Sequence, residues 1–224
     1  MATLLVPNYG EVVIPNGIST LNAFRKWVHS GVLPEKLPVH FLQGEVWLDF
    51  YMEEVFSHGQ VKDAVHRVVS SLVADQKLGR VFPDRTLLTN DEAALAAEPD
   101  LMYASFRTLK SKRIRYKAGA TTGAFATEVV GTPDLVVEIV SPSSEDKDLE
   151  KLMTLYHDAG IPEYWLIDAR AEPLRFEILK HTTKEYGPMP IRGGWVKSPV
   201  FGRAFRLTQG IAEDGYPSYD LEIR

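Results

Sequence analysis

The 224-residue sequence contains no cysteine, which excludes disulfide bonds and metal sites built on thiolates. It also lacks any apolar run long enough to span a bilayer. The N-terminus has neither the basic start nor the apolar core of a signal peptide, and no repeat or low-complexity segment is visible. We therefore expect a cytoplasmic protein that does not cross a membrane.

Positive charge is in the minority, with 25 Lys and Arg against 30 Asp and Glu, a net charge of −5. This balance argues against a protein that coats nucleic acid indiscriminately, but it permits a local basic surface. Because 45% of the residues are hydrophobic, the chain can bury one good core, and we expect a single domain over residues 1–224. We expect its core at about 38–180, an N-terminal extension at 1–37 and a β-rich decoration at 181–224.

The stretch 133–168 organises the rest of the chain. Residues 135–140 form an apolar run that only Glu138 interrupts, which is typical of a strand covered on both faces. Apolar residues in 149–156 then recur at helical spacing, and Gly160 ends the predicted helix. Residues 164–167 begin a second apolar strand. A strand, helix and strand of this length predict a right-handed parallel crossover.

Glu138 is therefore predicted to lie inside a buried sheet, where a lone carboxylate costs several kcal/mol unless it is paired, protonated or bound to a metal. Asp100 is its best candidate partner, because it opens the apolar strand predicted at 101–106 and could face Glu138 from a neighbouring strand. An Asp after a Pro is also a common turn residue. Asp134 is four residues from Glu138 on one strand, about 13 Å away, so it could bind the same ion only through water or a bulge.

Residues 39–51 predict a hairpin around Gln43 and Gly44, which leaves Glu45 beside the turn, most often a solvated position. A strong apolar stripe from Val61 to Val73 predicts a helix. Its expected N-terminal signal is a capping box formed by Ser57 and Gln60, and Gly79 is expected to close it. We assign no chemical role to His58 or His66, since no spacing around them matches a zinc site.

One dense basic run, RTLKSKRIRYK, extends from Arg107 to Lys117. Such a run is often a solvated loop or hairpin face. Beside an acidic metal site, it would be a natural surface for a polyanionic backbone such as DNA.

The block PDLVVEIVSPSS, followed by a helix that ends in LYHDAGIPEYWLID, closely resembles the Uma-type family of restriction-endonuclease-like proteins, within the PD-(D/E)xK nuclease superfamily. The resemblance continues through FLQGEVWLDF, SHGQVKDAV and EPDLMYASF, and covers roughly residues 38–180. It implies a mixed α/β (α+β) restriction-endonuclease-like fold, in which helices flank a central mixed β-sheet. It also implies Mg²⁺-dependent cleavage of DNA.

In that chemistry, Asp100 and Glu138 would be the metal ligands for Mg²⁺ or Mn²⁺, and a lysine would orient or deprotonate the attacking water. The sequence departs from the superfamily pattern at Val140, where the motif expects this lysine. Lys147 and Lys151 lie one turn apart on the next predicted helix, and either could supply the ammonium. We favour Lys147 because it is nearest the turn, although either could instead be an exposed lysine paired with an acid on its own helix.

Three functions remain open. The first is a metal-dependent endonuclease that hydrolyses DNA phosphodiester bonds. The second is a nucleic-acid-binding or assembly module that keeps the fold but has lost catalysis, which Val140 and the acidic balance favour. The third is a metal-assisted hydrolase of a small phosphate ester, since fold alone does not fix the substrate. By analogy with nucleases that cut duplexes, a homodimer is compatible with any of these.

Overall fold

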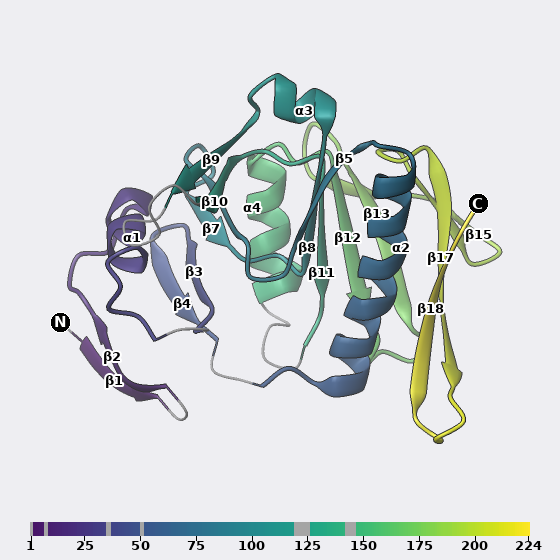
Figure 1. Cartoon of the computed structure of the whole chain (residues 1–224), viewed down its shortest axis with the longest axis horizontal. Coiled ribbons are helices and arrows are strands. Elements are labelled where there is room, and N and C mark those ends of the chain that lie inside the picture. Colours follow the sequence, from purple (N-terminus) through teal and green to yellow (C-terminus); the bar gives the residue numbers. More distant parts are fainter. Residues whose placement is uncertain (1, 7–8, 35–36, 50–51, 119–125, 142–146) are drawn as a thin grey trace.

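The computed structural model describes residues 2–6, 9–34, 37–49, 52–118, 126–141 and 147–224 (Figure 1). It contains four α-helices and two short π-helical turns. They are α1 (Leu21–Val28), η1 (Val55–Gln60), α2 (Val61–Asp75), α3 (Phe106–Lys110), η2 (Lys147–Leu152) and α4 (Met153–Asp158). No helix in these described ranges is long and apolar enough to cross a bilayer.

Two six-stranded sheets form the body of the protein. The first sheet has the strand order β4 (Glu45–Leu48), β3 (Val39–Leu42), β7 (Leu95–Ala97), β6 (Leu87–Asn90), β10 (Ala126–Gly131), β9 (Ile114–Ala118). The second sheet has the order β14 (Tyr186–Pro188), β13 (Arg175–His181), β12 (Glu163–Asp168), β11 (Leu135–Ile139), β8 (Leu101–Ser105), β5 (Gly79–Pro83). Both sheets are mixed, so the predicted α+β class is confirmed.

Two smaller sheets are formed by the ends of the chain. Near the N-terminus, β1 (Ala2–Val6) pairs with β2 (Gly10–Ile14). Near the C-terminus, four strands follow the order β15 (Ile191–Arg192), β16 (Trp195–Ser198), β17 (Arg203–Ile211), β18 (Pro217–Ile223). This sheet lies within the β-rich decoration predicted at 181–224, and its last strand, β18, lies at the sheet edge.

The predicted crossover is present at the centre of the second sheet. β11 and β12 are parallel, with Leu135 opposite Glu163 and Ile139 opposite Ile167, and η2 and α4 connect them. β8 pairs with β11 on the other side and runs antiparallel to it. The apolar side chains of β11 are fully buried on both faces, because a separate hydrophobic core packs against each face.

Alternation along β11 sends its side chains into two different cores. Val136 and Val140 pack with Tyr156 of α4 and with residues of the first sheet, so α4 is held between the two sheets (Figure 1). Val137 and Ile139 face the opposite way and pack with the apolar stripe of α2 and with strands of the C-terminal sheet. A third core joins α1 to the outer face of the first sheet.

The α2 region differs from the prediction at both ends. Its entry is capped one turn earlier, because the Glu54 carboxylate accepts the backbone N–H groups of Phe56 (3.1 Å) and Ser57. The capping box predicted at Ser57 is therefore wrong. At the other end, Lys77 adopts the left-handed backbone conformation (φ 52°) that was expected of Gly79. Gly79 instead begins β5, where a Cβ atom would collide with the carbonyl oxygen of Ala104.

Candidate active site

Asp100 and Glu138 lie on neighbouring strands of the second sheet, near the start of β8 and the end of β11. The antiparallel register of β8 and β11 pairs Val136 with Met102 and Val137 with Leu101, so its continuation sets Glu138 opposite Asp100. The Ile139 backbone N–H donates to Asp100 Oδ2 at 2.8 Å. The sheet therefore brings both acids to one place, and both are buried, Asp100 at 8% and Glu138 at 4% exposure.

Asp100 contacts two basic side chains, His58 of η1 and Lys62 at the start of α2. Lys62 Nζ lies 3.0 Å from Asp100 Oδ1, and His58 Nε2 lies 3.4 Å from Oδ2. Burial alone would raise the pKa of Asp100. The hydrogen bond and charge of His58, the charge of Lys62 and the Ile139 N–H outweigh burial and lower this pKa to about 2. Asp100 is thus an anion at neutral pH.

Lys62 is a largely buried ammonium in contact with three carboxylates. Besides Asp100, its Nζ lies 2.9 Å from Glu53 and 3.0 Å from Asp84. Burial acts to lower the pKa of Lys62, but the charges of Asp100 and Asp84 and the bonds to Glu53 and Asp84 raise it. The ammonium therefore stays charged although four-fifths of the side chain is shielded from water.

His58 links the same acids through both of its ring nitrogens, with Nδ1 2.9 Å from Glu53 and Nε2 3.4 Å from Asp100. Burial lowers the pKa of His58, whereas Asp100 and Glu53 raise it, and the net shift is upward. Sequence reasoning assigned no role to His58 and did not consider Lys62. The available signal was their spacing of four residues, which puts both on one helical face.

Glu138 meets a different helix. The Tyr156 hydroxyl of α4 donates to Glu138 Oε1 at 2.5 Å, and both groups are buried. A hydrogen bond of this kind fixes the rotamer of the carboxylate. The two acids therefore have separate supports, Asp100 from η1 and α2 and Glu138 from α4.

Of the two lysines named from the sequence, the structure describes the side chain of Lys151. Lys151 Nζ forms an ion pair with Glu45 Oε2 at 2.6 Å and lies 4.3 Å from the centre of the Trp47 ring. The ion-pair partner of Lys151 among the described side chains is therefore the hairpin acid Glu45. The backbone of Lys147 begins η2, but its side chain is outside the part of the protein that the structure describes.

Asp134 lies at the opposite end of β11 from Glu138. Its carboxylate accepts the Ser105 backbone N–H at 2.6 Å and the Thr108 hydroxyl at 2.7 Å, and so it holds the start of α3. The pairing of β11 with both neighbours is regular from Leu135 to Val137, so no bulge there shortens the path to Glu138. We therefore leave Asp134 out of the proposed metal ligands.

The basic run occupies α3, the turn after it and β9. Since β8 begins after Asp100 and ends at Ser105, which caps α3, this run starts at the far end of β8 from the acid pair. α3 therefore does not lie beside the acid pair, the setting in which the sequence made this run a natural surface for DNA. The acid Asp100 and the basic run are close in the sequence, but β8 places them at opposite ends of one strand.

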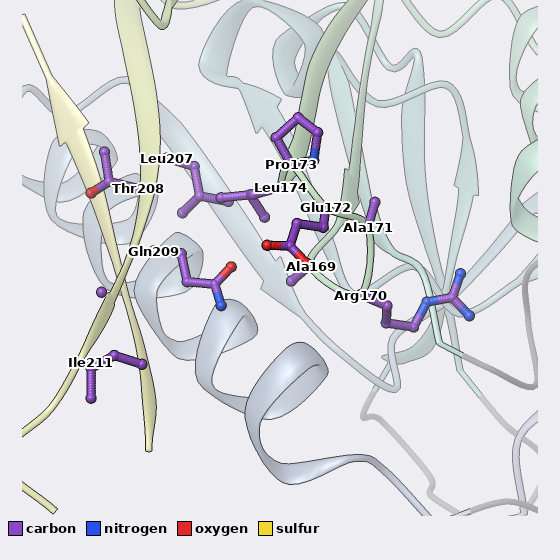
Figure 2. A pocket seen from close by; sticks show the side chains of 11 residues that line it. Ala169, Arg170, Ala171, Glu172, Pro173, Leu174, Leu207, Thr208, Gln209 and Ile211 are labelled. Carbon is purple, nitrogen blue, oxygen red and sulfur yellow. The ribbon is translucent and has the colours of Figure 1, made fainter. Parts of the chain in front are cut away.

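A groove of about 880 Å³ opens next to the carboxyl end of β12 (Figure 2). Loop 169–174 forms one wall and residues 207–211 of β17 form the other. Figure 2 shows the side chains of Leu174 and Leu207 side by side, whereas Arg170 points away from them. Asp100 and Glu138 do not line this groove, so it is separate from the acid pair.

The acid pair fits a hard cation by its chemistry. Within the described residues, no three His, Asp or Glu side chains form a group that could hold a metal by themselves. Mg²⁺ does not require one, because it commonly binds one or two carboxylates and completes its shell with water and substrate phosphate oxygens. Asp100 and Glu138 supply two such carboxylates at adjacent positions.

Asp100 should make stability depend on pH in the acid range. Its pKa is about 2 in the folded protein against an ordinary value of 3.8, so the stabilisation is complete above pH 4 and is lost as the pH falls toward 2. The shift corresponds to about 2 kcal/mol. The free energy of unfolding should be measured in urea at pH 5 and at pH 2. The fall in this free energy between the two pH values should be about 2 kcal/mol smaller in Asp100→Asn than in the wild type. Equal losses in both proteins would contradict the assignment.

Comparisons with known proteins bear on the family and on the fold. The Uma2 family model, described as "Putative restriction endonuclease", matches residues 23–209. A search of curated proteins gave no match. Among solved structures, the protein is similar to one from Anabaena variabilis ATCC 29413, described as a putative nuclease belonging to DUF820, with a TM-score of 0.61 and 21% identity over 82% of this chain and 90% of that one. This likeness is in the fold.

Proposed function

The chain belongs to the Uma2 family, and we propose that it is a metal-dependent endonuclease that hydrolyses phosphodiester bonds of DNA. The observation that carries the proposal is the position of Asp100 and Glu138 opposite each other on adjacent strands of the second sheet. The Lys62 ammonium lies 3.0 Å from Asp100. Two buried carboxylates with separate supports and one buried cation are more than the packing of the sheet requires. Strongly perturbed, clustered groups of this kind are typical of functional sites.

Asp100 and Glu138 would hold Mg²⁺ or Mn²⁺. When bound, such an ion supplies charge stabilisation at phosphorus and lowers the pKa of a bound water. The protein's own part is to orient both carboxylates and to keep Asp100 charged. The hydrogen bond from Tyr156 orients Glu138, and the contacts from His58, Lys62 and Ile139 orient Asp100 and keep it charged.

We assign the lysine role of the reaction to Lys62 among the described side chains. In hydrolysis a water oxygen bonds to phosphorus, the P–O ester bond breaks, and the leaving oxygen takes up a proton. Negative charge grows on the phosphoryl oxygens during this step, and a fixed ammonium in a poorly hydrated site stabilises it strongly. Lys62 is already fixed by its three acids, so little reorganisation is needed. Lys147 is the alternative that the sequence favours.

A second candidate is a nucleic-acid-binding module on the same fold that does not cleave. It is favoured by Val140, which is fully buried and donates its backbone N–H to the Ile167 carbonyl at the position where the superfamily motif has its lysine. It is also favoured by the cations that already neutralise Asp100. No described contact favours a small-ester hydrolase over these two candidates.

The proposal is tested by incubating the protein with supercoiled plasmid, linear duplex and single-stranded DNA in Mg²⁺, Mn²⁺, Ca²⁺ or EDTA. We expect cleavage products with Mg²⁺ or Mn²⁺ and none with EDTA. Calorimetry with Mn²⁺, with and without a non-cleavable oligonucleotide, should show that the phosphate strengthens metal binding. Binding of DNA without any cleavage in all metals would reject the nuclease and support the binding module.

A further inference from the structure

We propose that the surface formed by α3, its following turn and β9, called here the α3–β9 surface (residues 106–118), binds phosphates of the DNA backbone several base pairs away from the acid pair. The inference rests on the proposed function, because it assumes that DNA is the substrate. It adds a second binding region and a length requirement that the acid pair alone would not impose.

The α3–β9 surface is strongly basic, and its basic side chains are exposed to solvent. Residues 106–118 contain six cations and no acid. Within the described part of the chain, the one ion pair of this surface joins Arg113 Nη1 to Asp134 at 3.9 Å. Two acids lie near Arg115 and Lys117, and both are already paired with Arg25: Asp91 and Glu128. The other five cations are exposed and have no described ion pair: Arg107, Lys110, Lys112, Arg115 and Lys117. In a protein of net charge −5, this concentration of unneutralised charge favours a polyanion as its partner.

The surface also has a shape suited to a phosphate. Arg107 and Arg113 line a cavity of about 430 Å³ with the hydroxyl-bearing residues Ser105, Thr108 and Ser111. Two guanidinium groups can donate paired hydrogen bonds to phosphate oxygens. Asp134 also lines this cavity, and its carboxylate accepts hydrogen bonds from Ser105 and Thr108, so it holds the backbone of α3 in place.

The fold determines how far this surface is from the acid pair. The five residues of β8 separate Asp100 from the start of α3, and at about 3.4 Å per residue they span about 17 Å. Backbone phosphates along one DNA strand follow at about 3.4 Å per base pair. A duplex that has a phosphate at the acid pair would therefore meet the α3–β9 surface about five base pairs further along, so very short duplexes would not reach both regions.

The test is fluorescence anisotropy of a labelled 20-base-pair duplex without divalent metal, at several salt concentrations. The Arg107→Ala/Arg113→Ala variant should bind more weakly, and the slope of log K against log salt should fall by about 2, one for each phosphate that is no longer neutralised. The Arg115→Ala/Lys117→Ala variant should show the same direction of change. Arg206→Ala is the matched control, because Arg206 pairs with Glu222 in the C-terminal sheet, and its slope should equal that of the wild type.

Unchanged slopes in both double variants would overturn the proposal, as would equal binding of 4-base-pair and 20-base-pair duplexes to the wild type. Because binding is measured without metal, it does not depend on cleavage. A reduced slope in the double variants together with no cleavage by the wild type would reject the nuclease and keep the α3–β9 surface. Normal cleavage with unchanged slopes would keep the nuclease and reject the α3–β9 surface.

Discussion

The Glu138→Gln variant should lose DNA cleavage by a factor of at least about 10³ while it keeps the fold, since removal of a group that stabilises the reacting charge costs this much or more. Glutamine has the same shape, and its amide oxygen can still accept the hydrogen bond from Tyr156. What it lacks is the negative charge that a hard cation requires. The variant therefore separates the electrostatic role of Glu138 from its packing.

The measurement is initial cleavage rate at saturating Mg²⁺ together with Mn²⁺ calorimetry and thermal unfolding. Glu177→Gln is the control, because Glu177 lies on β13 of the same sheet and pairs with Arg175 near the surface. It should cleave at the wild-type rate. A Glu138→Gln protein that is folded and retains more than a tenth of the wild-type rate would remove Glu138 from the proposed site.

Replacement of Lys62 with methionine should reduce the cleavage rate by about 10² to 10³, the usual cost of removing one positioned charge from an active site. Methionine retains the apolar stem but not the ammonium. Metal affinity should not fall, because Asp100 loses the cation that competes for its Oδ1 atom. A selective fall in turnover with retained metal binding is the signature that a purely structural lysine would not produce.

Three further variants make this test decisive. Lys62→Arg keeps the charge and should retain most of the stability that Glu53 and Asp84 provide. Lys197→Met, on the exposed surface of β16, is the control and should behave as wild type. Lys147→Met tests the alternative from the sequence. Full cleavage by Lys62→Met, with loss in Lys147→Met, would return the lysine role to Lys147.

Much of the second sheet could be predicted because its signals are local. The apolar run around Glu138, the helical spacing that follows and the second apolar strand are sufficient for a parallel crossover, and β11 and β12 have it. The preference for Asp100 over Asp134 as the neighbour of Glu138 also came from a local argument, the rise of a strand per residue. The register of β8 and β11 agrees with that preference.

Other features could not be read along the chain. The cap of η1 is Glu54, three residues before Ser57, and sequence spacing does not decide which of two possible caps the chain uses. Lys151 meets Glu45 from the first sheet, 106 positions earlier, and only the packing of α4 between the two sheets brings them together.

The sequence by itself determined the α+β class, the family resemblance, the buried setting of Glu138 and its nearest acid, because each depends on periodicity or on motifs within a few residues. Only the tertiary structure decided which basic side chains contact Asp100 and where the basic run lies relative to the acid pair. His58 and Lys62 reach Asp100 because α2 packs across the second sheet, and α3 is carried away from the acids by the full length of β8. Both results depend on contacts between segments about forty residues apart or on the direction of a strand, and local residue patterns contain neither.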